Sequence, residues 1–136
     1  MKNQNECYTS FSVSLPITLM ENFIQELGIV DFEKKTSRAL CDEVTLKIGK
    51  NKVYGVDVGS MVIKTLTPLF GKEELLKELK DKYNLHYYIE IVPSLYSNNI
   101  TPAFFFNSKI IEFCYKTQTE IDIDLYLLNG NKKYKD

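Results

Sequence analysis

Three carboxylates near the end of the chain are spaced so that they could act together. Glu120, Asp122 and Asp124 alternate with aliphatic residues in the stretch EIDIDLYLL. On a β-strand, residues two apart point the same way and lie about 7 Å apart, so the acids form one row. Such a row could bind a divalent cation or share acid–base work, but these tasks need more oxygen ligands or a buried acid. A solvated strand face or a docking surface explains the same pattern.

The single histidine could act as a general base only with help from another strand. His86 lies in the stretch LHYYIE, on the same predicted strand face as Tyr88 and Glu90. Residues four apart on a strand are about 13 Å apart, so His86 needs a partner from a neighbouring strand. A site between His86, Glu90 and Asp122 would make the chain a small-molecule or metal-dependent enzyme, which is one alternative function.

Other motifs for catalysis are missing from the sequence. Cys7, Cys41 and Cys114 are far apart and no CxxC occurs, so a Cys/His zinc site has no ligand set. The stretch GVDVGS lacks the lysine and the spacing of a phosphate-binding loop, and there is no GxSxG nucleophile motif. We therefore expect no enzyme activity, no catalytic residue, no cofactor and no metal site.

Composition and charge narrow the class of protein. The 136 residues are 44% hydrophobic and 26% charged, with a formal net charge of −1, which is typical of a globular chain. Nucleic-acid binders usually carry a basic excess, so nucleic acid is not an expected partner. The sequence shows neither a membrane span of about 20 apolar residues nor a signal peptide, and we expect a cytoplasmic protein with no membrane partner. We expect one domain over 1–136, with a core over about 7–128 and a short polar tail over 129–136.

The spacing of apolar residues predicts the elements that position these side chains. Alternation predicts strands over 7–15, 85–93 and 120–128, and two short strands within 44–59 that turn at Gly49 to Asn51. A further short strand is expected over 103–107. Helical spacing predicts helices over 16–29, 60–70, 72–84 and 107–118, with 29–43 as a connection. Alternating strands need only one covered face. The predicted fold is α+β: a two-layer sandwich of a mainly antiparallel sheet with helices on one face. Its first six elements have ferredoxin-like order, followed by an extra strand-helix-strand.

Several stretches occur in a recognisable order: SFSVSL, PITLMENFIQELGI, VYGVDV, LLKELKDKY, IEIVPSLYS and FFFNSKIIEFCYKTQTEIDIDLYLL. In this order they resemble the bacterial family known as domain of unknown function 4279, over roughly residues 8–128. The closing helix followed by IDIDLYLL is the most specific piece. The resemblance implies a single-domain bacterial protein and carries no reaction, cofactor or catalytic residue. Small domains of this kind occur among the immunity proteins of bacterial toxin systems.

One predicted surface is a candidate for partner binding. The sheet face away from the helices would gather tyrosines, serines and acids, and the partner-binding residues we expect there are Tyr8, Tyr88, Glu90, Asp122, Asp124 and Tyr126. Tyrosine offers a large contact area with a polar tip, and acids steer a surface toward a basic partner. The leading hypothesis is a non-catalytic protein-binding module, in its most concrete form an immunity protein that covers a basic toxin domain. A structural homo-oligomer, such as a homodimer through the same face, is the other alternative.

Overall fold

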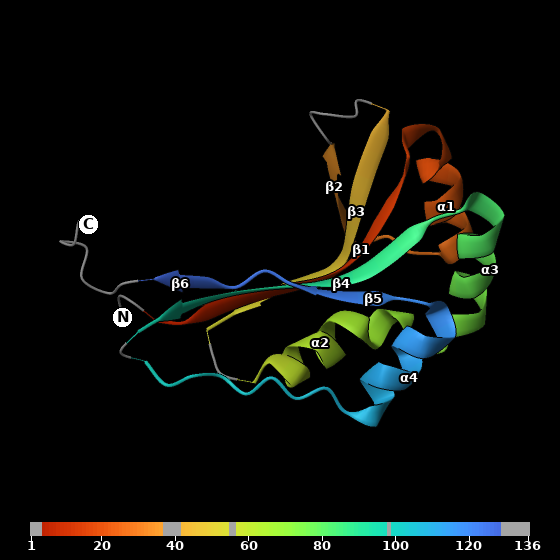
Figure 1. Ribbon diagram of the computed structural model, residues 1–136. Coiled ribbons are helices and arrows are strands. Elements are labelled where there is room, and N and C mark those ends of the chain that lie inside the picture. Colours follow the sequence, from red (N-terminus) through yellow and green to blue (C-terminus); the bar gives the residue numbers. More distant parts are fainter. Residues whose placement is uncertain (1–3, 37–41, 55–56, 98, 129–136) are drawn as a thin grey trace.

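Alternating and helically spaced apolar residues build the strands and helices of this protein, shown as a computed structural model in Figure 1. The structure describes residues 4–36, 42–54, 57–97 and 99–128, so Cys41 and the predicted tail 129–136 lie outside it. The strands are β1 (Glu6–Pro16), β2 (Phe32–Thr36), β3 (Glu43–Val53), β4 (His86–Tyr96), β5 (Glu120–Ile123) and β6 (Tyr126–Leu128). The helices are α1 (Met20–Leu27), α2 (Val58–Leu66), α3 (Glu73–Tyr83) and α4 (Ser108–Thr117), with 3-10 turns at Ile17–Leu19 and Thr67–Leu69. None of the described helices has the length and apolar character to cross a membrane.

The strands form one sheet in the order β2-β3-β1-β4-β5, with β6 also paired to β4. β1 is antiparallel to β3 and β4, and β3 is antiparallel to β2, whereas β5 and β6 run parallel to β4. Consequently β3 lies between the parallel strands β1 and β2, and β1 lies between the parallel strands β3 and β4. This is the split βαβ pattern of ferredoxin-like folds, and it places the acidic strand β5 beside β4.

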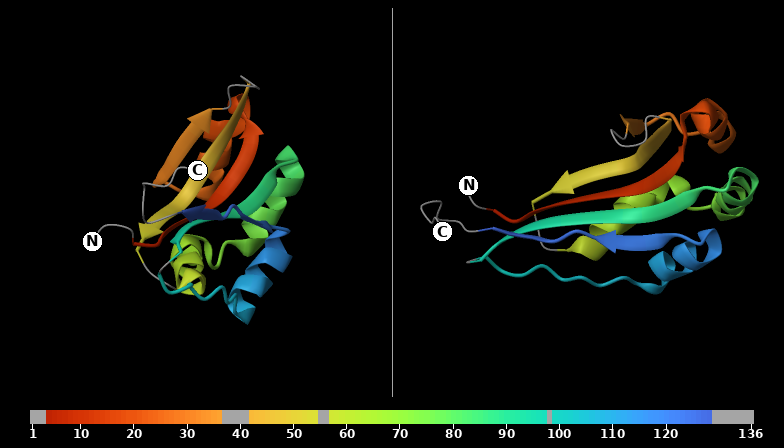
Figure 2. Two further views of the ribbon diagram at one scale, coloured as in Figure 1. Left: turned by 60° about the vertical axis from the view of Figure 1, so that its left-hand side comes forward. Right: turned by 45° about the horizontal axis from the view of Figure 1, so that its top comes forward.

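The helices cover one face of the sheet, with α2 and α4 along it and α1 and α3 at one end (Figures 1 and 2). Phe11 and Leu15 of β1 point into this layer and are fully buried. Tyr87 of β4 lies among the aromatic rings of the core, 5.2 Å from the ring of Phe11 and 6.4 Å from that of Phe23 in α1. Its hydroxyl donates to the carbonyl of Leu76 in α3 at 2.7 Å. The predicted α+β fold with helices on one face is confirmed.

Two details of the predicted strand pattern are wrong. Residues 43–53 do not turn at Gly49 but form the single strand β3. The strand that pairs with β3 at this edge is β2, which lies inside the predicted connection 29–43. All five residues of β2 are exposed, so its stretch FEKKT has no apolar side from which alternation could be recognised.

The predicted strand over 103–107 does not form. In this segment only Ala103 makes a bridge, with Asp57, and its carbonyl accepts the N–H of Val58 at the start of α2 at 3.2 Å. The segment therefore extends along the helix layer, and the addition to the ferredoxin-like core is α4 followed by β5 and β6.

A β-bulge takes the place of the predicted turn. The register between β1 and β3 shifts between Thr9 and Phe11, where Gly49 of β3 has a left-handed φ of 66°, a conformation that glycine supplies at bulges. A Cβ on Gly49 would lie 2.3 Å from the carbonyl oxygen of Thr65 in α2. The Thr65 hydroxyl donates to the Gly49 carbonyl at 2.9 Å and lies 2.6 Å from the Thr9 hydroxyl. The bulge is therefore the place where α2 docks on the sheet.

A proline on β4 divides the closing segment into β5 and β6. β5 pairs with β4 as far as Ile123 opposite Ile91, and β6 resumes with Tyr126 opposite Ser94 in the same register. Pro93 of β4 lies between these pairs and has no N–H to donate. The aliphatic row of the segment faces the helix side but stays partly exposed, with exposed fractions of 39% for Ile121, 43% for Ile123, 48% for Leu125 and 76% for Leu127.

We expect Gly49→Ala to lower the free energy of unfolding by about 2–4 kcal/mol, because alanine disfavours the left-handed conformation and its Cβ would overlap the Thr65 carbonyl. Gly71→Ala is the matched control. Gly71 also has a positive φ, of 95°, but a Cβ there meets no atom within 4 Å. Gly71→Ala should therefore lower the free energy of unfolding by only about 1 kcal/mol. Urea unfolding measures both, and equal losses would contradict the importance of the contact with α2.

Candidate partner-binding face of the sheet

The open face, which is the side of the sheet away from the helices, holds the six residues expected to bind a partner: Tyr8, Tyr88, Glu90, Asp122, Asp124 and Tyr126. Glu90 of β4 lies opposite Asp122 of β5 in the ladder, so their side chains share this face. The hydroxyl of Tyr126 donates to Asp124 at 3.3 Å, which places these two on it as well. Alternation in the sequence therefore predicts correctly that these side chains share one face of the sheet.

An ion pair crosses the open face above the central strand. Lys47 of β3 pairs with Glu90 of β4, and their side chains are only 12% and 28% exposed. Ser10 and Ser12 of β1 lie beneath the pair, both buried and 3.2 Å apart at their hydroxyls, and Ser10 donates to Glu90 at 3.5 Å. Because serine is small, two long side chains can meet across the strand that separates them.

Two further lysines of β3 lie close to the ring of Tyr8. The Nζ atoms of Lys50 and Lys52 are 5.4 and 5.3 Å from the centre of its ring, within the range of cation–π attraction. Hydrogen bonding to Tyr8 is the largest cause that raises the pKa of Lys52. Lys50 also pairs with Glu33 of β2 at 3.1 Å, and Lys52 with Glu6 of β1 at 3.6 Å. These lysines are therefore neutralised by acids of the same face.

Sequence reasoning missed this lysine row. In an uninterrupted strand, Lys47 and Lys52 would point to opposite faces because their separation is odd. The bulge at Gly49 adds one residue and brings both lysines onto the open face. The signal in the sequence is the alternation of Lys47 with the apolar residues Leu46 and Ile48, which are buried. The expected turn at Gly49 hides the fact that the same strand continues to Lys52.

The acidic part of the open face lies over β5 and β6. Within the described residues, no lysine, arginine or histidine forms an ion pair with Asp122 or Asp124. Tyr88 is partly exposed and Tyr126 is 49% exposed. The open face is thus polarised, with paired lysines over β3 and uncompensated carboxylates beside tyrosines over β4 to β6.

A general-base role for His86 requires a partner from a neighbouring strand, and the structure does place the acidic strand β5 beside β4. His86 Nε2, however, lies 2.9 Å from Oε1 of Glu120, whereas Glu90 pairs with Lys47. The bond to His86 is the main cause that lowers the pKa of Glu120 below its usual value. The described part of the chain holds no group of three or more His, Cys, Asp or Glu side chains that could bind a metal ion. His86, Glu90 and Asp122 are therefore not gathered into one cluster.

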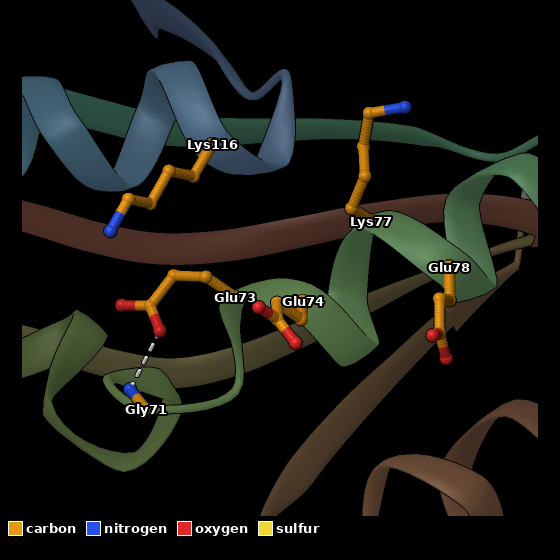
Figure 3. Close-up of a pocket in the computed structure, with 6 residues that line it drawn as sticks. All are labelled: Gly71, Glu73, Glu74, Lys77, Glu78 and Lys116. Carbon is orange, nitrogen blue, oxygen red and sulfur yellow. Dashed lines mark hydrogen bonds between the residues drawn. The ribbon is translucent and has the colours of Figure 1, made fainter.

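Two hollows in the described surface lie on the helix side. One between α3 and α4 is lined by Gly71, Glu73, Glu74, Lys77, Glu78 and Lys116 (Figure 3). In this hollow the carboxylate of Glu73 accepts the N–H of Gly71 at 2.9 Å, so it is engaged by the turn that precedes α3. A neighbouring hollow contains Cys114, but burial raises the pKa of this thiol to about 11, and the same holds for Cys7. Both thiols are protonated at neutral pH and are weak nucleophiles.

We expect Glu90→Gln to lower the free energy of unfolding by about 1–3 kcal/mol, because it leaves the largely covered Lys47 without a countercharge. Glu33→Gln is the matched control, since it breaks the pair with Lys50, whose side chains are 41% and 54% exposed, and should cost less than about 1 kcal/mol. Urea unfolding at neutral pH compares the two variants. A loss no larger for Glu90 than for Glu33 would refute the structural role of the crossing pair.

We expect His86→Ala to raise the pKa of Glu120 toward its usual value, because the main hydrogen bond that stabilises the carboxylate is lost. Titration of the side-chain carboxyl carbon by NMR measures this shift. Lys80→Met serves as the control, since Lys80 is a smaller cause of the low pKa and its removal should move the value less. Because the pKa of Glu120 is lowered in the folded state, its carboxylate stabilises the fold at pH values above the unfolded-state pKa. This stabilisation is lost as pH falls through the folded-state pKa. An unchanged Glu120 titration in the histidine variant would count against the pair.

A family model described as Domain of unknown function (DUF4279) matches residues 45–128. The match extends from within β3 to the end of β6 and includes the lysine row, β4 and the acidic segment, whereas β1, α1 and β2 precede it. No curated protein and no solved structure matches the chain. Because the matched region spans more than half of the sequence and most of the sheet, the chain belongs to the DUF4279 family.

Proposed function

We propose that this protein is a non-catalytic protein-binding module whose open face docks on another protein. The observation that carries the proposal is the uncompensated pair Asp122 and Asp124 beside the partly exposed rings of Tyr88 and Tyr126. Tyrosine is enriched at protein interfaces because it combines a large apolar ring with a polar tip. No described lysine, arginine or histidine pairs with the carboxylates of Asp122 and Asp124, so their negative charge is left for a partner to meet.

The partner that fits this surface is basic. Acids over β5 and β6 attract lysine and arginine side chains, while each lysine over β3 already pairs with an acid and adds little repulsion. In the most concrete form of the proposal, the partner is a basic toxin domain and this protein is the cytoplasmic immunity protein that covers it in a bacterium. The sign of the exposed charge supports this form.

The test is to capture the partner from native lysate with tagged protein, identify it by mass spectrometry, and measure its binding rates. We expect the double variant Asp122→Lys, Asp124→Lys to slow association by about tenfold or more at low salt, because charge steers encounter more than it holds the complex. The effect should shrink as salt is added.

The matched control is Glu74→Lys with Glu78→Lys, which makes the same change in net charge at exposed positions of α3. Both double variants are first checked for native unfolding temperature and circular dichroism. If both slow association equally, only net charge matters. If neither does, the open face is not the docking surface.

A further inference from the structure

The outer edge of the closing segment offers backbone groups to a further strand. Within the described residues, β5 pairs with β4 and no strand pairs with its other side. The N–H of Asp124 donates to the carbonyl of Ile91 in β4 at 2.8 Å. Because backbone groups alternate in direction along a strand, the N–H and C=O groups of Ile121 and Ile123 point outward, away from β4.

The side chains of this edge are incompletely covered on the helix side. Ile89 and Ile91 of β4 are fully buried, yet their neighbours in the ladder, Ile121 and Ile123, are 39% and 43% exposed. Leu125 and Leu127 continue the same exposed row along the segment. A strand added outside β5 would cover this row as β5 itself covers the isoleucines of β4.

The two edges of the sheet differ in how they discourage pairing. The opposite edge, β2, exposes Lys34 and Lys35, and lysines on an edge strand discourage pairing. Residues 120–128 contain no lysine, arginine or proline. Only the acidic row on the open face, Glu120, Asp122 and Asp124, limits what can pair there.

This row decides which strand fits. A second copy of the segment would set its own acids beside Asp122 and Asp124, and like charges on neighbouring strands are destabilising. A strand with lysine or arginine on one side and aliphatic residues on the other would complement both rows at once. We propose that the β5–β6 edge binds an extended segment of another protein in which basic and aliphatic residues alternate, by adding it to the sheet.

This inference goes beyond the proposed function, because it concerns the edge of the sheet and its backbone groups rather than docking on the open face. The edge can bind a peptide even if the open face binds no folded protein. The reverse also holds, so the failure of one proposal leaves the other standing.

The experiment uses the full chain labelled with nitrogen-15 and the synthetic heptapeptide Lys-Val-Lys-Val-Lys-Val-Lys. The isomer Lys-Lys-Lys-Lys-Val-Val-Val has the same composition and charge but cannot separate basic from apolar side chains on a strand. We expect the alternating peptide to slow hydrogen exchange at the Ile121 and Ile123 amides by about tenfold or more. The isomer should bind at least about tenfold more weakly.

Two protein variants separate the edge from bulk charge. Asp122→Asn with Asp124→Asn should weaken the alternating peptide by about tenfold, whereas Glu74→Gln with Glu78→Gln on α3 should leave it unchanged. Three results would each overturn the inference: no binding of the alternating peptide, equal binding of the isomer, or binding without added protection at Ile121 and Ile123.

Discussion

The contact between Gly49 and Thr65 is the constraint on which the arrangement of this protein depends. The left-handed glycine lets β3 bulge, and the bulge brings the Gly49 carbonyl to the Thr65 hydroxyl while leaving no room for a Cβ beside the α2 backbone. One extra residue in β3 also reverses which residues face the helices. The docking of α2 on one side and the lysine row on the other side therefore have the same origin.

The lysine row in turn shapes the open face. Small serines on β1 allow Lys47 to reach Glu90 across the central strand, and Lys50 and Lys52 both lie within cation–π range of Tyr8. These contacts use the basic groups of β3 within the fold, and no described lysine, arginine or histidine pairs with Asp122 or Asp124 at the far side. The open face is therefore acidic over β5 and β6, and a basic partner can recognise this polarity.

The sequence predicts the faces of strands better than their boundaries or neighbours. Alternation was sufficient to place Tyr8, Glu90 and Asp122 on one face, because period two follows from strand geometry alone. The sequence predicts four strands in the ferredoxin-like core, as observed, but misplaces one of them. A glycine that supplies a bulge has the same pattern as a turn, and β2 gives no alternation because all its residues are exposed. Strand order and the exposure of Ile121 depend on how far the helix layer extends, which local patterns do not encode.

Side-chain footprinting of the protein in complex with its captured partner tests the central claim most directly. Hydroxyl radicals modify exposed tyrosines, and the chain has reporters on both sides: Tyr88 and Tyr126 on the open face, and Tyr115 of α4, 76% exposed, on the helix side. The account predicts that the partner protects Tyr88 and Tyr126 and leaves Tyr115 as reactive as in the free protein. Protection of Tyr115 with unchanged reactivity of the two open-face tyrosines would contradict it.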